Sequence, residues 1–92
     1  MVLKTQAALE IVNEKGLHAR ASAKLVEVVE RFDASAEVER DGMSASGDSI
    51  MGLLMLAAVK GTTIQVRTSG NEAQPLLDAI AALVADRFGE EC

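Results

Sequence analysis

The chain contains one histidine, His18, and Arg20 follows it two residues later. A single histidine cannot build a multi-histidine metal site, and the only cysteine, Cys92, stands at the far end of the sequence. The serine, aspartate and glutamate residues show no spacing that identifies a Ser-His-Asp triad or a pair of acid/base carboxylates. We therefore predict no metal site, and chemistry that depends on His18 and Arg20.

The residues after His18 predict an amphipathic helix that begins at this histidine. Apolar residues recur at steps of three and four between Ala19 and Phe32. Free amides at a helix start favour a bound phosphate and disfavour a charged imidazole, whose reference pKa is about 6.5. Arg20 adds a permanent cation that can bridge phosphate oxygens. Together these groups suit a phosphoryl acceptor, although spacing alone also allows His18 to be a simple helix cap and Arg20 a solvated charge.

Composition restricts the class of protein and its partners. A length of 92 residues predicts one domain, residues 1–92, and an apolar content of 49% is enough for a core. The net charge of −5 disfavours binding to nucleic acid or to an anionic membrane surface. The longest apolar run, residues 50–59, is too short for a membrane span, which needs roughly 20 residues. The first residues lack the apolar stretch of a secretory signal, and one cysteine forms no intrachain disulfide, so we expect a cytoplasmic monomer.

The hydrophobic pattern predicts an α+β fold. Alternation predicts strands at residues 4–12, 34–39, 43–46 and 62–68, and Asp41-Gly42 is a typical tight hairpin turn. After the first helix, a short helix is expected at residues 50–55, stopped by Lys60-Gly61. A third is expected from Asn71, as its cap, to Phe88. Each helix has one apolar stripe to bury, so we predict a four-stranded antiparallel sheet with three helices on one face, in the order βαββαβα.

Two short motifs resemble the signatures of HPr, the histidine-containing phosphocarrier family of the bacterial phosphotransferase system. The first is GLHAR at residues 16–20, and the second, about thirty residues later, is DSIMG at residues 48–52. The likeness extends over almost the whole chain and includes the hairpin and the final helix. It implies the open-faced β-sandwich of that family.

The resemblance implies roles for individual residues. His18 would accept a phosphoryl group on Nδ1 from phospho-enzyme I and pass it to an enzyme IIA domain. Arg20 would steady the phosphate, and the backbone amides of Ala19 and Arg20 would bind it. Such a phosphocarrier would need no cofactor and would not itself turn over a substrate. The family commonly has proline where this chain has Ala21, so both the sugar-uptake branch and the regulatory nitrogen-type branch stay open.

The second motif implies a regulatory site and a docking surface. Ser49 corresponds to the serine that HPr kinase/phosphorylase modifies in some lineages, and the alternative is a plain helix N-cap. A phosphate there would place nearly two negative charges beside the docking surface. The short helix has more apolar residues than its inner side can bury, so we expect an exposed patch that binds partners. The alternative is that all of these residues enter the core. The expected partner-binding residues are Ile50, Met51, Leu54, Met55 and Ala21.

Two other functions compete with this interpretation. The tripeptide at residues 48–50 resembles the phosphopantetheine attachment site of acyl or peptidyl carrier proteins. Those carriers are helical bundles, whereas the alternating runs here predict strands. The other alternative is a binding module of the same fold that does not relay phosphate. The presence of His18 argues against it.

Cys92 follows two glutamates, a setting that predicts an unreactive thiol.

Overall fold

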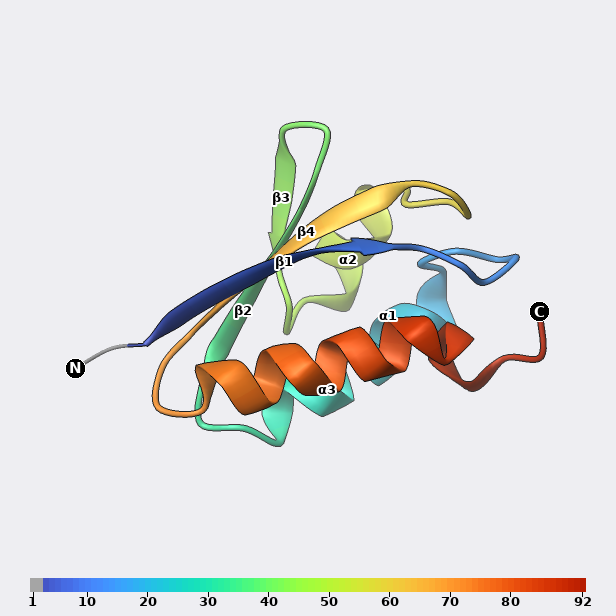
Figure 1. The fold of residues 1–92 in the computed structure, drawn as a ribbon. Helices are drawn as coiled ribbons and strands as arrows, with labels where there is room; N and C mark the ends of the chain where they lie inside the picture. Colours follow the sequence, from blue (N-terminus) through green and yellow to red (C-terminus); the bar gives the residue numbers. More distant parts are fainter. Residues whose placement is uncertain (1–2) are drawn as a thin grey trace.

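The computed structural model describes residues 3–92, and it confirms the predicted sheet with three helices on one face (Figure 1). The four strands are antiparallel and lie in the order β1-β4-β2-β3. They are β1 (Lys4–Glu10), β2 (Ser35–Arg40), β3 (Met43–Ser46) and β4 (Thr63–Ser69). The helices are α1 (Ala19–Glu30), α2 (Ile50–Met55) and α3 (Ala73–Ala85), followed by a short 3-10 helix (Arg87–Gly89). Within residues 3–92, none of the helices is long and apolar enough to cross a membrane.

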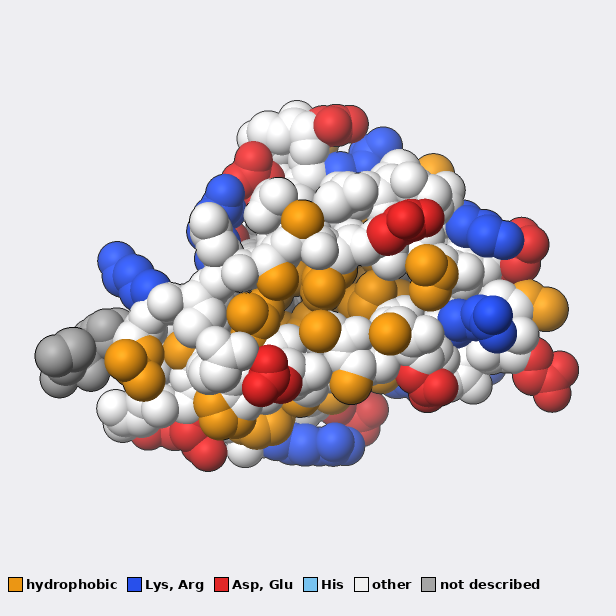
Figure 2. All heavy atoms as spheres, viewed as in Figure 1, with side chains coloured by type: hydrophobic (Ala, Val, Ile, Leu, Met, Phe, Trp, Pro, Cys, Tyr) orange, Lys and Arg blue, Asp and Glu red, His pale blue; other side chains and the backbone are white. Residues whose placement is uncertain are grey.

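The core lies between the sheet and the helices because each strand alternates between a buried and an exposed face. On β4, for example, Ile64 and Val66 are completely buried, whereas their neighbour Gln65 is not. Leu25 of α1 and Ile80 of α3 are completely buried against this face. Figure 2 shows the edge of this layer, where apolar side chains gather between the sheet and α3.

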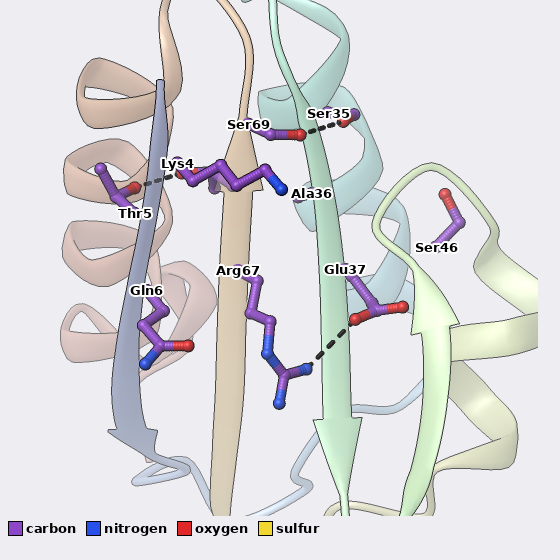
Figure 3. Close-up of a pocket in the computed structure, with 10 residues that line it drawn as sticks. Lys4, Thr5, Gln6, Ser35, Ala36, Glu37, Ser46, Arg67 and Ser69 are labelled. Carbon is purple, nitrogen blue, oxygen red and sulfur yellow. Dashed lines mark hydrogen bonds and ion pairs between the residues drawn. The ribbon is translucent and has the colours of Figure 1, made fainter. Parts of the chain in front are cut away.

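The opposite face of the sheet is polar, and a shallow hollow of about 720 Å³ lies on it. In Figure 3 the side chain of Arg67 extends across this face toward Glu37. The guanidinium of Arg67 lies 3.1 Å from a carboxylate oxygen of Glu37 and 2.6 Å from one of Glu39. These partly exposed ion pairs contribute little to stability. None of the predicted site residues lines the hollow.

The hairpin between β2 and β3 forms at the predicted turn. Asp41 and Gly42 have φ angles of 50° and 81°, the left-handed values that a two-residue turn of this type requires. Arg40 and Met43 are therefore paired directly across the turn. The dipeptide was a sufficient signal because glycine and aspartate tolerate this conformation better than most residues.

The ends of α2 and α3 differ from the prediction. The helix α2 ends at Met55, and Ala57 already has a φ of 50°, so Lys60-Gly61 is not its stop signal. The helix α3 begins at Ala73 with Glu72 as its N-cap, whereas the predicted cap, Asn71, donates to Oδ2 of Asp33 at 2.8 Å. At its other end, α3 stops at Ala85.

Phe88 was predicted to lie on the apolar face of α3, but it lies beyond the end of that helix. Arg87 and Phe88 have φ angles of 57° and 54°, which turn the chain away from the helix axis. The Phe88 side chain is nevertheless completely buried in the core. The sequence period was therefore right about burial and wrong about conformation, and the turn sends residues 89–92 in a new direction.

Candidate functional site

The loop before α1 is fixed by a close backbone contact at Gly16. Its φ of +65° favours glycine, and a Cβ atom there would lie 2.5 Å from the carbonyl oxygen of Ala58. The amide of Leu17 donates to that same oxygen at 2.9 Å. The loop that carries His18 is therefore attached directly to the segment that follows α2.

His18 lies at the N-cap of α1, as the sequence predicted. Its backbone is extended, with φ −80° and ψ −176°, and its side chain makes no capping hydrogen bond. The imidazole is therefore free for other contacts and is 27% exposed. The amide of Ser22 donates to His18 O at 2.8 Å, so the amides of Ala19, Arg20 and Ala21 precede this bond at the positive end of the helix.

The imidazole of His18 contacts a carboxylate from the C-terminal segment. Its Nε2 atom forms a hydrogen bond with Oε2 of Glu90, a residue 72 positions away in the sequence. Oε1 of Glu90 accepts from Nδ2 of the buried Asn13 at 2.9 Å. The hydrogen bonds from Asn13 and from His18 lower the pKa of Glu90, which keeps this carboxyl group ionised at neutral pH.

Neither Asn13 nor Glu90 is identified as a site residue by the sequence pattern. Asn13 belongs to no motif in the sequence, and Glu90 is notable there only as one of the two glutamates that precede Cys92. No spacing could have identified them, because the contact with His18 depends on the C-terminal segment folding back across the start of α1.

Arg20 is exposed and lies beside the same contact. It lines a shallow pocket of about 210 Å³ together with Glu90 and residues from both ends of the chain: Glu14, Lys15, Glu91 and Cys92. The carbonyl oxygen of Cys92 accepts from the amide of Glu14 at 3.0 Å, which holds the end of the chain here. The Cys92 thiol is exposed and forms no disulfide.

The second motif forms the start of α2 and an apolar surface. Oγ of Ser49 accepts from the amide of Gly52 at 3.0 Å, so Ser49 is an N-cap as predicted. Met51 and Met55 are 71% and 68% exposed, and Ile50 is also exposed. Leu54 is half-buried, and the neighbouring Leu53 is completely buried. We call the exposed Ile50, Met51 and Met55, together with the half-buried Leu54, the α2 patch.

Ala21 was predicted to contact partners, and this prediction is wrong for its side chain. Ala21 is completely buried because it belongs to the apolar stripe of α1 that faces the core. Ala19 and Arg20, one and two residues earlier, are exposed. The accessible start of α1 therefore consists of His18, Ala19 and Arg20.

Comparison with known proteins gives consistent matches along most of the chain. A family model described as the PTS HPr component phosphorylation site matches residues 5–86. The phosphocarrier protein HPr of Cupriavidus necator is 46% identical over 80 residues, which cover 87% of this chain and 90% of the relative. The phosphocarrier protein NPr of Shewanella violacea is 41% identical over 87 residues, covering 95% and 96%. The crystal structure of HPr-C-His from Thermoanaerobacter tengcongensis has a TM-score of 0.91 at 31% identity, covering 96% of this chain and 99% of that one.

Proposed function

Because this chain belongs to the HPr family of phosphocarrier proteins of the phosphotransferase system, we propose that His18 is its phosphoryl acceptor. In this proposal Nδ1 of His18 receives the group from phospho-enzyme I and passes it to an enzyme IIA domain. The observation that carries it is a partly exposed imidazole at the positive end of α1. The relatives include both an HPr and an NPr, so the proposed acceptor belongs to either the sugar-uptake or the nitrogen-type branch.

The arrangement of groups around His18 supports each step of the transfer. The Nδ1 lone pair attacks phosphorus, a new N–P bond forms, and the bond to the donor breaks with its electron pair leaving on the donor. The negative charge on the phosphoryl oxygens would be stabilised by the amides of Ala19 and Arg20 and by the Arg20 guanidinium. The same groups act in the second transfer, and the chain returns to its starting state.

Incubation with enzyme I and labelled phosphoenolpyruvate tests the proposal. We expect acid-labile, base-stable phosphate in the peptide that contains His18, because a phosphorus–nitrogen bond has this stability. Wild-type protein that takes up no label would overturn the proposed function. A separate incubation with a protein kinase tests Ser49, because phosphate on a serine hydroxyl is stable to acid.

Arg20→Glu is expected to slow phosphoryl transfer from enzyme I by roughly tenfold or more, because a charge-assisted hydrogen bond to phosphate is replaced by repulsion. Rapid-quench measurement of the labelling rate checks this expectation. Arg31→Glu is the matched control, since Arg31 is also exposed but lies at the opposite end of α1. Equal rates for the two variants would show that the Arg20 guanidinium takes no part in transfer.

We propose that the α2 patch is the docking surface for enzyme I and for enzyme IIA domains. Exposed methionines adapt their shape to different apolar surfaces, which suits a protein with several partners. The helices α1 and α2 pack against each other, so the patch belongs to the same part of the molecule as the helix that carries His18.

Met51→Glu is expected to weaken binding to enzyme I by about tenfold, because a charge replaces the most exposed apolar side chain of the patch. Isothermal titration calorimetry with enzyme I measures the change in Kd. Leu3→Glu is a suitable control, because Leu3 is also an exposed apolar residue but precedes β1. A Kd that changes equally in both variants would argue against docking at α2.

The proposal also includes Ser49 as a regulatory phosphorylation site for HPr kinase/phosphorylase. Its hydroxyl oxygen lies at the start of α2, two residues before Met51. A phosphate there would be locally compatible with the helix N-terminus but would add nearly two negative charges beside the patch. Weaker docking of both partners would follow from this charge.

A further inference from the structure

We propose that Glu90 positions His18 for transfer by holding the imidazole proton on Nε2, which leaves the lone pair on Nδ1. This inference rests on the proposed function of His18. A carboxylate can only accept a hydrogen bond, so in the contact between Glu90 Oε2 and His18 Nε2 the proton belongs to the ring nitrogen. A neutral imidazole has one N–H, and Nδ1 is then the nucleophilic atom.

Contacts on both sides of Glu90 hold the C-terminal segment in place. Phe88 anchors the segment in the core, and its carbonyl oxygen accepts from Nζ of Lys24 at 2.5 Å. On the other side of Glu90, the carbonyl oxygen of Cys92 accepts from the Glu14 amide at 3.0 Å. The Glu90 side chain is only 16% exposed between these two anchors. It also lies beyond residues 5–86, to which the family model matches.

Asn13 fixes the orientation of the Glu90 carboxylate. Its Nδ2 atom donates to Oε1 of Glu90 at 2.9 Å and to the carbonyl oxygen of Gly16 at 2.9 Å. Asn13 is completely buried, its bond to Gly16 is buried and its bond to Glu90 is part-buried. One carboxylate oxygen therefore faces Asn13 and the other faces His18. This arrangement links the Gly16 loop, the C-terminal segment and the imidazole in one hydrogen-bonded chain.

The contact has a second effect after His18 has accepted the phosphoryl group. The new bond forms at Nδ1 while Nε2 keeps its proton, so the ring acquires a positive charge. The negative charge of Glu90 stabilises this cationic ring and opposes loss of the Nε2 proton. A ring protonated at Nε2 departs as neutral imidazole when the next acceptor attacks phosphorus, and is therefore the better leaving group.

Glu90→Ala and Glu91→Ala form a matched pair for testing this role, because each removes one carboxylate from adjacent positions. In the unphosphorylated protein, 15N NMR of the imidazole should show a smaller Nε2–H tautomer fraction in Glu90→Ala and an unchanged fraction in Glu91→Ala. In the phosphorylated protein, hydrolysis of phosphohistidine at neutral pH should be slower in Glu90→Ala than in wild type, because the ring loses the carboxylate that stabilises its positive charge, and unchanged in Glu91→Ala. Both variants keep the charged side chains of Glu14, Lys15 and Arg20, which line the same pocket.

The two measurements separate this role from the proposed function. Tautomer fractions and hydrolysis rates that agree between Glu90→Ala and wild type would overturn the role of Glu90 and leave phosphoryl transfer intact. Wild-type protein that takes no phosphate from enzyme I would overturn the proposed function. The tautomer comparison would then still decide whether Glu90 sets the protonation of His18.

Discussion

Replacement of His18 with alanine is expected to abolish phosphate uptake from enzyme I while the protein stays folded. The imidazole supplies the nitrogen that bonds to phosphorus, and no second histidine exists in the chain. The helix start does not depend on this side chain, because the first intrahelical bond uses the His18 carbonyl oxygen. We therefore expect complete loss of acid-labile label, with a change in unfolding free energy of about 1 kcal/mol or less.

Ser49→Ala is the control for this prediction. It removes the hydroxyl oxygen that accepts from the Gly52 amide, which costs about 1 kcal/mol of stability. Its labelling by enzyme I should nevertheless equal that of the wild type. Acid-labile phosphate on His18→Ala at the wild-type level would show that another residue is the acceptor.

Gly16→Ala is expected to cause the largest loss of stability among these variants, about 2–4 kcal/mol. Part of the loss comes from the left-handed φ of +65°, and part from the Cβ atom, which would lie 2.5 Å from the Ala58 carbonyl oxygen. Relief of this clash requires the loop to move away from the segment after α2, with loss of the Leu17 hydrogen bond. Urea unfolding measures the stability change, and the labelling rate should fall because His18 moves with the loop.

Gly61→Ala separates the two contributions. Gly61 also has a positive φ, +89°, but a Cβ atom there would meet nothing within 4 Å. We therefore expect only the stability loss caused by the left-handed backbone conformation, about 1 kcal/mol, and a normal labelling rate. If Gly16→Ala were no more destabilising than Gly61→Ala, the close approach to Ala58 would be unimportant.

The parts of the fold that were predicted correctly depend on local patterns. The buried face of β4, the start of α1 at His18 and the Asp41-Gly42 turn each follow from residues a few positions apart. The helical repeat of apolar residues in the last segment also places Phe88 in the core. It could not reveal that Arg87 and Phe88 adopt left-handed backbone angles, because neither is a residue type that signals such a turn.

The candidate site also contains residues that local motifs predict and residues that they do not. His18, Arg20 and Ser49 belong to short motifs, so their places at helix starts were predictable. Ala21 was wrongly assigned to the docking surface, although its place on the apolar stripe of α1 indicated burial. Glu90 was missed because its contact with His18 spans 72 positions and exists only once the C-terminal segment has folded back.

The position of the last residues also determines how the protein should be handled in the laboratory. The Cys92 carbonyl oxygen is bonded to Glu14, and Cys92 lines the pocket that Arg20 and Glu90 share. An affinity tag or fluorescent fusion attached after Cys92 would crowd this pocket and pull on the segment that carries Glu90. The start of β1 lies at the opposite end of the molecule (Figure 1), so a tag placed before it would leave the imidazole and its surroundings undisturbed.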